Sequence, residues 1–210
     1  MLGAEVHLVD SIAQREAKAA EVYENLKQSG EKVFEIPIGG ASAVSTLGFV
    51  SAMQEISSQI QKLEIEFDHL FFSSSTAGTH AGMLLGAKLF GLRGLRIIGI
   101  SPEPDAKNVI VSEIERLLNE AGKLLEISTG DLLDKIEIDD RFAGAGYCVE
   151  TAPANAALKL LARTEAVLLD PVYTAKAFAA LIDRIEKGRL SAQDKILFWH
   201  TGGQITGFYA

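Results

Sequence analysis

The stretch from Asp68 to Gly82, which reads DHLFFSSSTAGTHAG, decides the fold of this chain. An apolar run, Leu70–Phe72, stops at three serines, small and hydroxyl-bearing residues follow at Thr76–Thr79, and a helix-like run begins at His80. This order predicts a strand, a turn and a helix N-terminus. The first N–H groups of a helix lack intrahelical partners, and the helix dipole favours an anion beside them. The stretch therefore indicates a phosphate-binding loop, and a serine-rich helix cap is the alternative.

Length and composition exclude several classes of protein. The chain has 210 residues, of which 48% are hydrophobic and 23% charged, as is typical of a soluble globular protein. A net charge of −8 without a basic cluster argues against nucleic acid or an anionic membrane as a partner. Cys148 is the only cysteine, which excludes an intrachain disulfide and a cysteine-based metal cluster and fits a reducing cytoplasm. No apolar run approaches the length of a membrane span.

Strand and helix patterns alternate along the chain. Compact apolar runs, typical of strands buried on both faces, occur at Leu70–Phe72, Leu95–Ile100, Ala166–Leu169 and Ile196–Trp199, and a further strand is predicted at Val6–Val9. Helices are predicted at Ile12–Ser29, Val44–Leu63, His80–Phe90, Val109–Ala121, Pro153–Arg163 and Thr174–Glu186.

This alternation predicts an α/β protein with a mainly parallel sheet flanked by helices. We expect the sheet between about Ser51 and Ala210, which would form the larger, ligand-binding domain (residues 51–210). Residues 1–50 would be the remainder of a smaller α/β domain.

Clusters of small residues follow predicted strands at Ser73–Gly78, Asp170–Thr174 and His200–Gly203. Ligands of open parallel sheets bind beyond the C-terminal ends of the strands, so the clusters should meet at one edge of the sheet. The Thr76–Thr79 loop is neither a Walker A loop nor a GxGxxG turn. An isolated phosphate group on a small cofactor is therefore the better prediction.

Candidate catalytic groups lie in and near these clusters. The Tyr173 hydroxyl could transfer a proton or orient a substrate, unless Tyr173 merely packs while Asp170 caps the following helix. The Thr201 hydroxyl could contact a ring nitrogen, although a simple glycine turn is the alternative. Tyr147 fits the core and the site equally well. Lys176 could form a Schiff base, but it lies within a predicted helix, where a solvated or ion-paired lysine is commoner. The histidines at positions 7, 69 and 80 show no metal-ligand pattern, and surface or capping roles are expected for them.

Four stretches together are similar to a known family. They are Ile36–Gly40 with Leu47–Phe49, Thr79–Gly82, Gly146–Tyr147 through Leu169–Ala177, and His200–Gly203. In these stretches the chain resembles the family of D-cysteine desulfhydrase and 1-aminocyclopropane-1-carboxylate deaminase, over essentially all 210 residues. Members of that family use pyridoxal 5′-phosphate (PLP) and have the tryptophan-synthase-β type of fold.

The resemblance implies roles for particular residues. It assigns Thr76, Ala77, Gly78 and Thr79 to the cofactor phosphate. It places Tyr147 and Tyr173 near the substrate end of the cofactor, and Thr201 with Gly202 beside the pyridine ring. It also implies a homodimer acting on a small amino acid, while the composition above indicates a cytoplasmic protein with no nucleic-acid or membrane partner.

The resemblance further favours one reaction over another. The deaminases place a glutamate after the tyrosine that matches Tyr173 and a leucine where Thr201 stands, whereas this chain has Thr174 and Thr201. A carboxylate would keep the pyridine nitrogen protonated and strengthen the ring as an electron sink, which a neutral hydroxyl does not. The prediction is therefore α,β-elimination of D-cysteine to pyruvate, ammonia and sulfide. The cyclopropane-carboxylate deaminase is the alternative, and a related sulfonate-releasing lyase stays open.

One implication of the resemblance concerns the catalytic lysine. In the family, the Schiff-base lysine and a Ser-Asn segment that binds the substrate carboxylate precede the strand that matches Ala4–Val9. We therefore expect both to be missing from these 210 residues. A catalytically silent PLP- or phosphate-binding or interaction protein is accordingly a second alternative.

Overall fold

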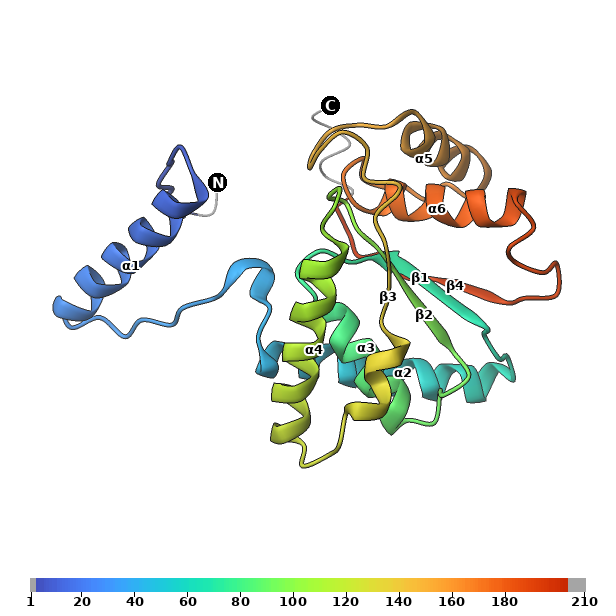
Figure 1. The fold of residues 1–210 in the computed structure, drawn as a ribbon, viewed down its shortest axis with the longest axis horizontal. Helices are drawn as coiled ribbons and strands as arrows, with labels where there is room; N and C mark the ends of the chain where they lie inside the picture. The colour runs from blue at the N-terminus through green and yellow to red at the C-terminus, as the bar shows by residue number, and fades with distance from the viewer. Residues whose placement is uncertain (1–2, 204–210) are drawn as a thin grey trace. The chain divides into compact units, whose positions relative to one another are not determined.

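The computed structural model describes residues 3–203, in two compact units that comprise Met1–Pro37 and Ile38–Ala210. Unit 2 contains a four-stranded parallel sheet in the order β3-β2-β1-β4 (Figure 1). Its strands are β1 (His69–Ser73), β2 (Arg96–Ile100), β3 (Glu137–Asp139) and β4 (Ile196–Phe198). The predicted parallel α/β architecture is confirmed. Residues 204–210, the end of the predicted larger domain, lie outside the described residues.

Helices cover both faces of the sheet. On one face lie α2 (Ala43–Leu63), α3 (Gly78–Leu89) and α4 (Lys107–Leu124), and on the other lie α5 (Ala152–Glu165) and α6 (Thr174–Glu186) (Figure 1). Successive side chains of a strand point to opposite faces, so Leu70 and Phe72 pack toward the first layer and Phe71 toward the second. All three are fully buried. The run Leu70–Phe72 is apolar throughout because both faces of β1 are covered.

Helix starts follow from local chemistry. The Ser42 hydroxyl accepts a hydrogen bond from the Ser45 N–H at the start of α2, and the Thr151 hydroxyl accepts one from Ala154 at the start of α5. The first turn of α3 has no side-chain cap, and Ala77 before it has a left-handed backbone (φ 69°). Short 3₁₀ helices, η1 (Ile38–Gly40) and η2 (Gly130–Lys135), complete unit 2.

Three local predictions for unit 2 differ from the structure. Ala166–Leu169 is not a strand, because Ala166 is left-handed and Val167 and Leu168 are about two-fifths exposed. The helix predicted to end at Ala121 continues to Leu124, so Gly122 lies inside it, where any side chain would overlap Thr129. The strand β3 was not predicted, since it contains only one apolar residue.

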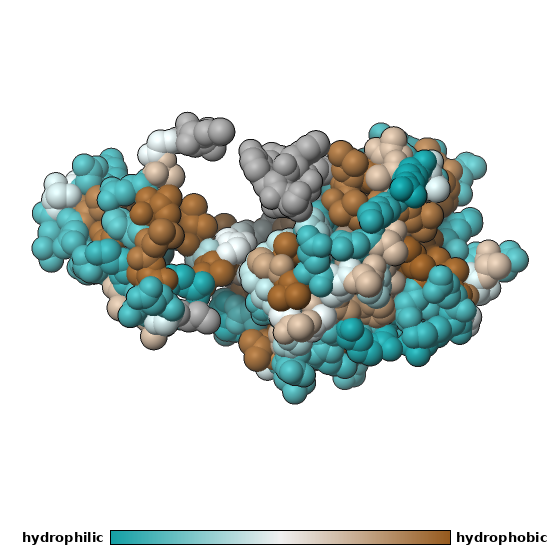
Figure 2. All heavy atoms as spheres, turned by 90° about the horizontal axis from the view of Figure 1, so that it is seen from above, coloured by the Kyte–Doolittle hydropathy of each residue, from teal (hydrophilic) through white to brown (hydrophobic). Residues whose placement is uncertain are grey.

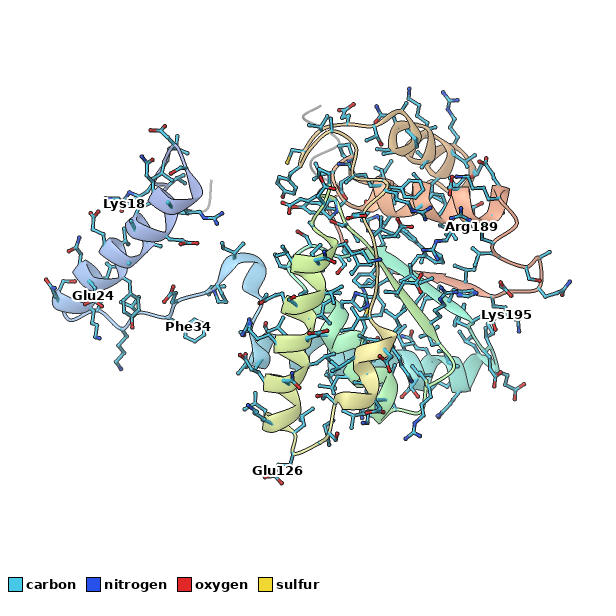
Figure 3. All side chains as sticks on the ribbon, in the orientation of Figure 1. Lys18, Glu24, Phe34, Glu126, Arg189 and Lys195 are labelled. Carbon is cyan, nitrogen blue, oxygen red and sulfur yellow. The ribbon has the colours of Figure 1, made fainter. Side chains whose placement is uncertain are left out.

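Unit 1 consists of α1 (Ile12–Gln28) and extended segments on either side of it. The predicted strand at Val6–Val9 is wrong as far as the structure describes the chain, because this segment pairs with no other strand. Leu8 and Phe34 remain 92% and 86% exposed, and Phe34 points away from the rest of unit 1 (Figure 3). Apolar side chains therefore lie at the surface of this unit (Figure 2).

The predicted domain boundary at residue 50 falls inside α2. The assignment of residues 1–50 to a smaller α/β domain stays a prediction. Within residues 3–203, no helix combines the length and the hydropathy that crossing a membrane requires.

Candidate active site

A cavity of about 250 Å³ lies at the C-terminal end of β1. Its walls come from the loop between β1 and α3, from the start of α6 and from the segment after β4. The lining residues are Gly39, Ser73, Ser74, Ser75, Thr76, Ala77, Thr79, Tyr173 and Thr201. The three small-residue clusters predicted to meet at one edge of the sheet thus contribute to a single cavity. We call it the rim cavity.

The loop side of the rim cavity is rich in hydrogen-bond donors. Five of the residues that line it carry hydroxyl groups, at positions 73, 74, 75, 76 and 79, and α3 begins at its wall without a side-chain cap. The backbone at Gly39 packs closely against Thr76 in the same wall. Gly39 has a φ of +63°, and any side chain on it would overlap Thr76. Uncapped N–H groups and hydroxyls around a small hollow favour an anionic guest.

Gly78 is the one residue of the predicted phosphate loop that does not line the rim cavity. A side chain added to it would make an ordinary contact with Ala41, at 3.6 Å. Its N–H donates to the Thr76 carbonyl, at 2.9 Å. Gly78 therefore lies beside the segment before α2.

Two tyrosines meet on the opposite side of the rim cavity. The hydroxyls of Tyr147 and Tyr173 are hydrogen-bonded, and their ring centroids lie 5.9 Å apart. Tyr173 lines the cavity, whereas Tyr147 is not among its lining residues and is 46% exposed. The hydrogen bond from Tyr173, with a smaller contribution from desolvation, raises the pKa of Tyr147 well above its usual value. Tyr147 is consequently protonated at neutral pH.

Tyr173 owes its position to the buried carboxylate of Asp170. One carboxylate oxygen accepts hydrogen bonds from the N–H groups of Val172 and Tyr173 (2.9 and 2.7 Å). The other accepts from the N–H and the hydroxyl of Thr174 (2.9 and 2.6 Å). Asp170 thus caps α6, as one reading of the sequence predicts, and Tyr173 still faces the cavity. The Thr174 hydroxyl is fully committed to Asp170 and does not line the cavity.

His200 shapes the turn that carries Thr201 and Gly202. Its Nδ1 accepts a hydrogen bond from the Gly202 N–H (3.0 Å), and its Nε2 lies 2.8 Å from the Leu168 carbonyl. A neutral ring whose Nδ1 accepts must carry its proton on Nε2, so Nε2 donates to that carbonyl. Gly202 has a φ of +94°, which favours glycine. Thr201 reaches the rim cavity, and Gly202 does not line it.

Lys176 is buried behind the site. Its Nζ donates to the carbonyls of Ala143 and Pro102, at 2.7 and 3.2 Å, and desolvation lowers its pKa. These bonds tie the loops that follow β2 and β3 to α6. Lys176 does not line the rim cavity, so it is not placed to form a Schiff base there.

His80 is the largest departure from the expectations for single residues. A surface or capping role was expected, but His80 is fully buried, with its ring edge-on to Phe72 at 5.1 Å. Burial lowers its pKa to about 3, although the nearby backbone of Ile97 partly opposes this shift. Neither ring nitrogen makes a hydrogen bond of normal geometry. Within the described residues, no cluster of histidine, cysteine and acidic side chains could hold a metal.

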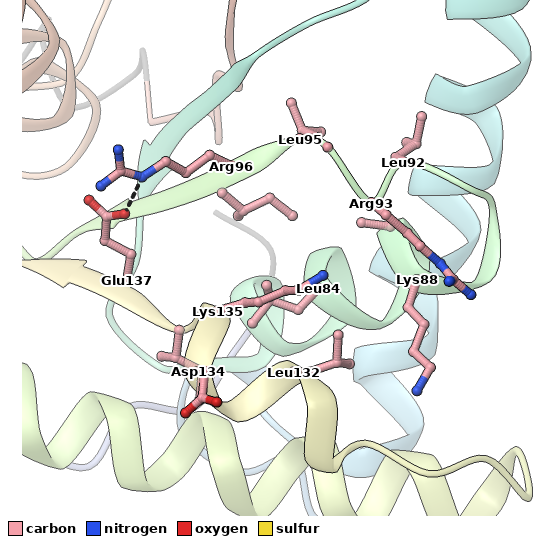
Figure 4. Close-up of a pocket in the computed structure, with 14 residues that line it drawn as sticks. Leu84, Lys88, Leu92, Arg93, Leu95, Arg96, Leu132, Asp134, Lys135 and Glu137 are labelled. Carbon is pink, nitrogen blue, oxygen red and sulfur yellow. Dashed lines mark hydrogen bonds and ion pairs between the residues drawn. The ribbon is translucent and has the colours of Figure 1, made fainter.

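A second cavity, of about 450 Å³, lies at the opposite end of the sheet (Figure 4). It is lined by the starts of β2 and β3, by η2 and by the end of α3. Arg96 and Glu137 form an ion pair on its wall (2.7 Å). Lys88 also lines the cavity and forms an ion pair with Asp131, which does not line it. It lies away from the edge where open parallel sheets bind ligands, and the rim cavity is the better candidate site.

The fold and the rim cavity define an α/β protein with a loop rich in hydrogen-bond donors at the C-terminal edge of a parallel sheet. The chain belongs to the pyridoxal-phosphate dependent enzyme family, whose sequence profile matches residues 1–202. Enzymes of this family depend on PLP, as the resemblance implied.

Individual relatives support this assignment. A protein of Pyrococcus furiosus, provisionally named a 1-aminocyclopropane-1-carboxylate deaminase, is 37% identical over 191 residues, which cover 91% of this chain and 56% of that protein. A D-cysteine desulfhydrase of Yersinia pestis is 33% identical over 205 residues, covering 97% and 60% respectively. A crystal structure of a homologue of ACC (1-aminocyclopropane-1-carboxylate) deaminase matches with a TM-score of 0.81 and 34% identity, over 94% of this chain and 57% of that one. The chain thus spans somewhat over half the length of these relatives.

The residues of the rim cavity fit the phosphate of PLP. Ser74 is among the residues that line the cavity, and its buried hydroxyl has no hydrogen-bond partner. The uncapped start of α3 and the hydroxyls of Thr76 and Thr79 lie in the same wall. A dianionic phosphate ester would use these donors, and Tyr173 and Thr201 would face the rest of the cofactor.

Proposed function

We propose that this chain forms the PLP-binding part of a lyase that eliminates hydrogen sulfide from D-cysteine. The observation that carries the proposal is the meeting of a donor-rich loop, a tyrosine pair and Thr201 around one cavity, in a chain of the PLP-dependent family. Among the curated relatives, the Yersinia pestis protein is named a D-cysteine desulfhydrase.

The proposed reaction converts D-cysteine and water into pyruvate, ammonia and hydrogen sulfide. The α-carbon gives its proton to a base of the full-length enzyme, the Cβ–S bond breaks, and the sulfur leaves with the electron pair of that bond and takes up a proton. Water then displaces the amino group. Bound PLP supplies the electron sink for the pair released at the α-carbon.

Residues of the chain hold the reactants and supply a proton. The loop from Thr76 to Thr79 holds the phosphate, and Thr201 contacts the pyridine ring with a neutral hydroxyl. Tyr173 faces the reacting end and gives its proton to the leaving sulfur, while Tyr147 holds the Tyr173 hydroxyl through their hydrogen bond.

The choice of D-cysteine follows from the charge of the cavity wall. No carboxylate lines the rim cavity in the described part of the chain, and Thr174 is committed to Asp170. An uncharged wall does not reinforce protonation of the pyridine nitrogen. Elimination of a thiolate demands less of the electron sink than opening a cyclopropane ring, so this wall favours D-cysteine.

A pair of assays tests the proposal. The full-length gene product should release sulfide and pyruvate from D-cysteine, with little ammonia from 1-aminocyclopropane-1-carboxylate. Tyr173→Phe should lower kcat by about 10²–10⁴-fold while the dissociation constant for PLP stays the same. Activity confined to the cyclopropane acid would establish the deaminase instead. PLP binding without either activity would favour a catalytically silent protein.

Assembly and location complete the proposal. We expect a homodimer, as the resemblance implies. We also expect a location in the cytoplasm, because the single cysteine fits a reducing compartment. Sedimentation analysis of the purified protein measures the assembly state directly.

A further inference from the structure

Lys176 is a buried ionisable residue to which the proposed mechanism gives no task. Its side chain is fully buried, and within the described residues it forms no ion pair with a carboxylate. Its Nζ donates instead to two backbone carbonyls, those of Ala143 (2.7 Å) and Pro102 (3.2 Å). Taking an amino group out of water is costly, and an apolar side chain of similar volume avoids that cost. A lysine at this position therefore calls for a function of the two hydrogen bonds.

The Ala143 carbonyl lies at the start of the segment that carries Tyr147. Residues 143–148 form a run of turns with neither helix nor strand. Gly144 and Cys148 in this segment have left-handed backbones, with φ of +77° and +61°. A segment of turns has few backbone hydrogen bonds of its own, so contacts from outside must set where Tyr147 lies.

The start of α6 holds this segment at two points. Tyr173 directly precedes α6, and Lys176 lies in its first turn. Lys176 bonds the Ala143 carbonyl at the beginning of the segment, and the Tyr173 hydroxyl bonds the Tyr147 hydroxyl near its end. Desolvation lowers the pKa of Lys176, and the nearby thiol of Cys148 partly opposes this shift. The residue next to Tyr147 thus also lies close to Lys176.

We propose that Lys176 is a positioning residue for the tyrosine pair, which anchors the segment at Ala143 so that the Tyr147 hydroxyl stays against that of Tyr173. Lys176 acts through Tyr147, since it does not line the rim cavity. The effect on catalysis rests on the proposed function, in which Tyr173 gives its proton to the leaving sulfur. The positioning of Tyr147 does not depend on that function.

The matched control is Lys88, a second lysine whose Nζ bonds a backbone carbonyl of a loop. It donates to the Ser128 carbonyl (2.6 Å) and forms an ion pair with Asp131 (2.5 Å). Lys88 lines the second cavity, at the end of the sheet opposite to the rim cavity. Lys88→Met therefore removes the same chemical group from a loop that carries no residue of the candidate site.

Hydrogen exchange followed by mass spectrometry tests the positioning in the full-length protein without substrate. In Lys176→Met, we expect faster exchange at the amides of residues 141–149, while those of β1 and α3 exchange as in the parent. Lys88→Met should leave residues 141–149 unchanged. If Lys176→Met does not fold, Lys176→Gln gives the same test with a smaller effect, because its shorter side chain keeps a donor. Unchanged exchange at residues 141–149 in the Lys176 variant overturns the proposal.

A double-mutant cycle tests whether Lys176 acts through Tyr147. In the elimination of D-cysteine, Lys176→Met should lower kcat ~10- to 100-fold without changing the dissociation constant for PLP, because the reacting groups are misplaced while the cofactor is still held. Lys88→Met should leave kcat unchanged. In Tyr147→Phe, the hydroxyl pair is already lost, so adding Lys176→Met should cause no further fall in kcat.

The other outcomes separate this proposal from the proposed function. Equal losses of kcat from Lys176→Met with and without the Tyr147 hydroxyl show that Lys176 does not act through Tyr147, and overturn the proposal. A fall in kcat together with weaker PLP binding shows a general disturbance of the site and overturns it as well. A parent enzyme that is inactive toward D-cysteine refutes the proposed function, and the exchange experiment still decides whether Lys176 positions the segment.

Discussion

Hydroxyl groups around the rim cavity divide into those that bind the protein itself and those that face the cavity. The Thr174 hydroxyl is bound on both sides by Asp170. The hydroxyls of Thr79 and Thr201 belong to residues that line the cavity. The sequence places all three threonines after predicted strands, but only their contacts separate a hydroxyl that is bonded within the protein from one whose residue lines the cavity.

Thr79→Val tests the phosphate loop. The substitution keeps the shape of the side chain and removes one donor to a charged group, so PLP binding should weaken by about 1.5–3 kcal/mol, or one to two decades in the dissociation constant. The backbone N–H groups of the loop remain, so binding is weakened rather than lost. Thr79→Ser restores the donor and should bind PLP nearly as tightly as the parent. Identical affinity of Thr79→Val and the parent would mean that the loop is only a helix cap.

His80 should give the protein a stability that depends on pH. Its pKa falls from 6.5 to about 3 on folding, so the unfolded chain binds the proton more readily. The contribution is fully present above pH 6.5 and is lost as pH falls toward 3. At pH 5 the loss should be roughly 2 kcal/mol.

Urea unfolding at pH 7 and pH 5 measures this loss, with His80→Gln as the comparison. The variant has no ionisable group at this position, and it should lose roughly 2 kcal/mol less than the parent between the two pH values. Equal losses in both proteins would show that His80 is accessible to protons in the folded state.

At the scale of elements, the packing of α2 against α3 holds the proposed phosphate loop in place. Small residues of α3 allow the close approach: a side chain on Gly82 would meet Phe49 at 2.5 Å, and one on Gly86 would meet Met53 at 2.5 Å. The buried Thr46 completes this contact from α2. Since α3 begins at the rim cavity, its packing on α2 also positions the N–H groups of its first turn.

Gly86→Ala should destabilise the protein, because the added methyl group collides with Met53. A loss of about 1–3 kcal/mol is typical of overpacking, and it should outweigh the gain in helix propensity. Gly48→Ala, in α2, is the matched control: nothing lies within 4 Å of the added atom, and the change should stabilise by up to about 1 kcal/mol. Thermal unfolding of both variants gives the answer, and a stabilised Gly86→Ala would contradict the close packing of α2 and α3.

Prediction of elements succeeded where the sequence pattern is local. Helices with clear boundaries, such as Thr174–Glu186, are confirmed to the residue. The apolar run Ala166–Leu169 failed because a strand needs a hydrogen-bonded neighbour, which no apolar pattern reports. The short strand β3 escaped prediction for the opposite reason, since pairing with β2 makes it a strand despite its polar sequence.

At the scale of the whole molecule, unit 2 has three layers, and the rim cavity draws on loops from both sides of the sheet. A ligand that fills the cavity binds the folded state only, so it must stabilise the protein by linkage. The magnitude depends on the ligand concentration relative to the dissociation constant.

Saturation with PLP should raise the unfolding temperature. At a hundred times the dissociation constant the gain is about 2.7 kcal/mol, or roughly 5–10 °C for a chain of this size. Pyridoxal at the same concentration should give a much smaller shift, because it lacks the group that the loop binds. Equal shifts for the two compounds, measured by scanning calorimetry, would place the binding energy in the ring and away from the phosphate loop.

The sequence by itself determined the parallel α/β class, most helices and the family, because apolar periodicity, capping residues and short motifs are local signals. It also named a set of site residues, five of which the structure brings to one cavity: Thr76, Ala77, Thr79, Tyr173 and Thr201. Only the tertiary structure decided that His80 is buried, that Thr174 is committed to Asp170 and that the Ser74 hydroxyl lacks a partner. Burial and hydrogen-bond satisfaction depend on residues that are distant in the sequence, so no local pattern can report them.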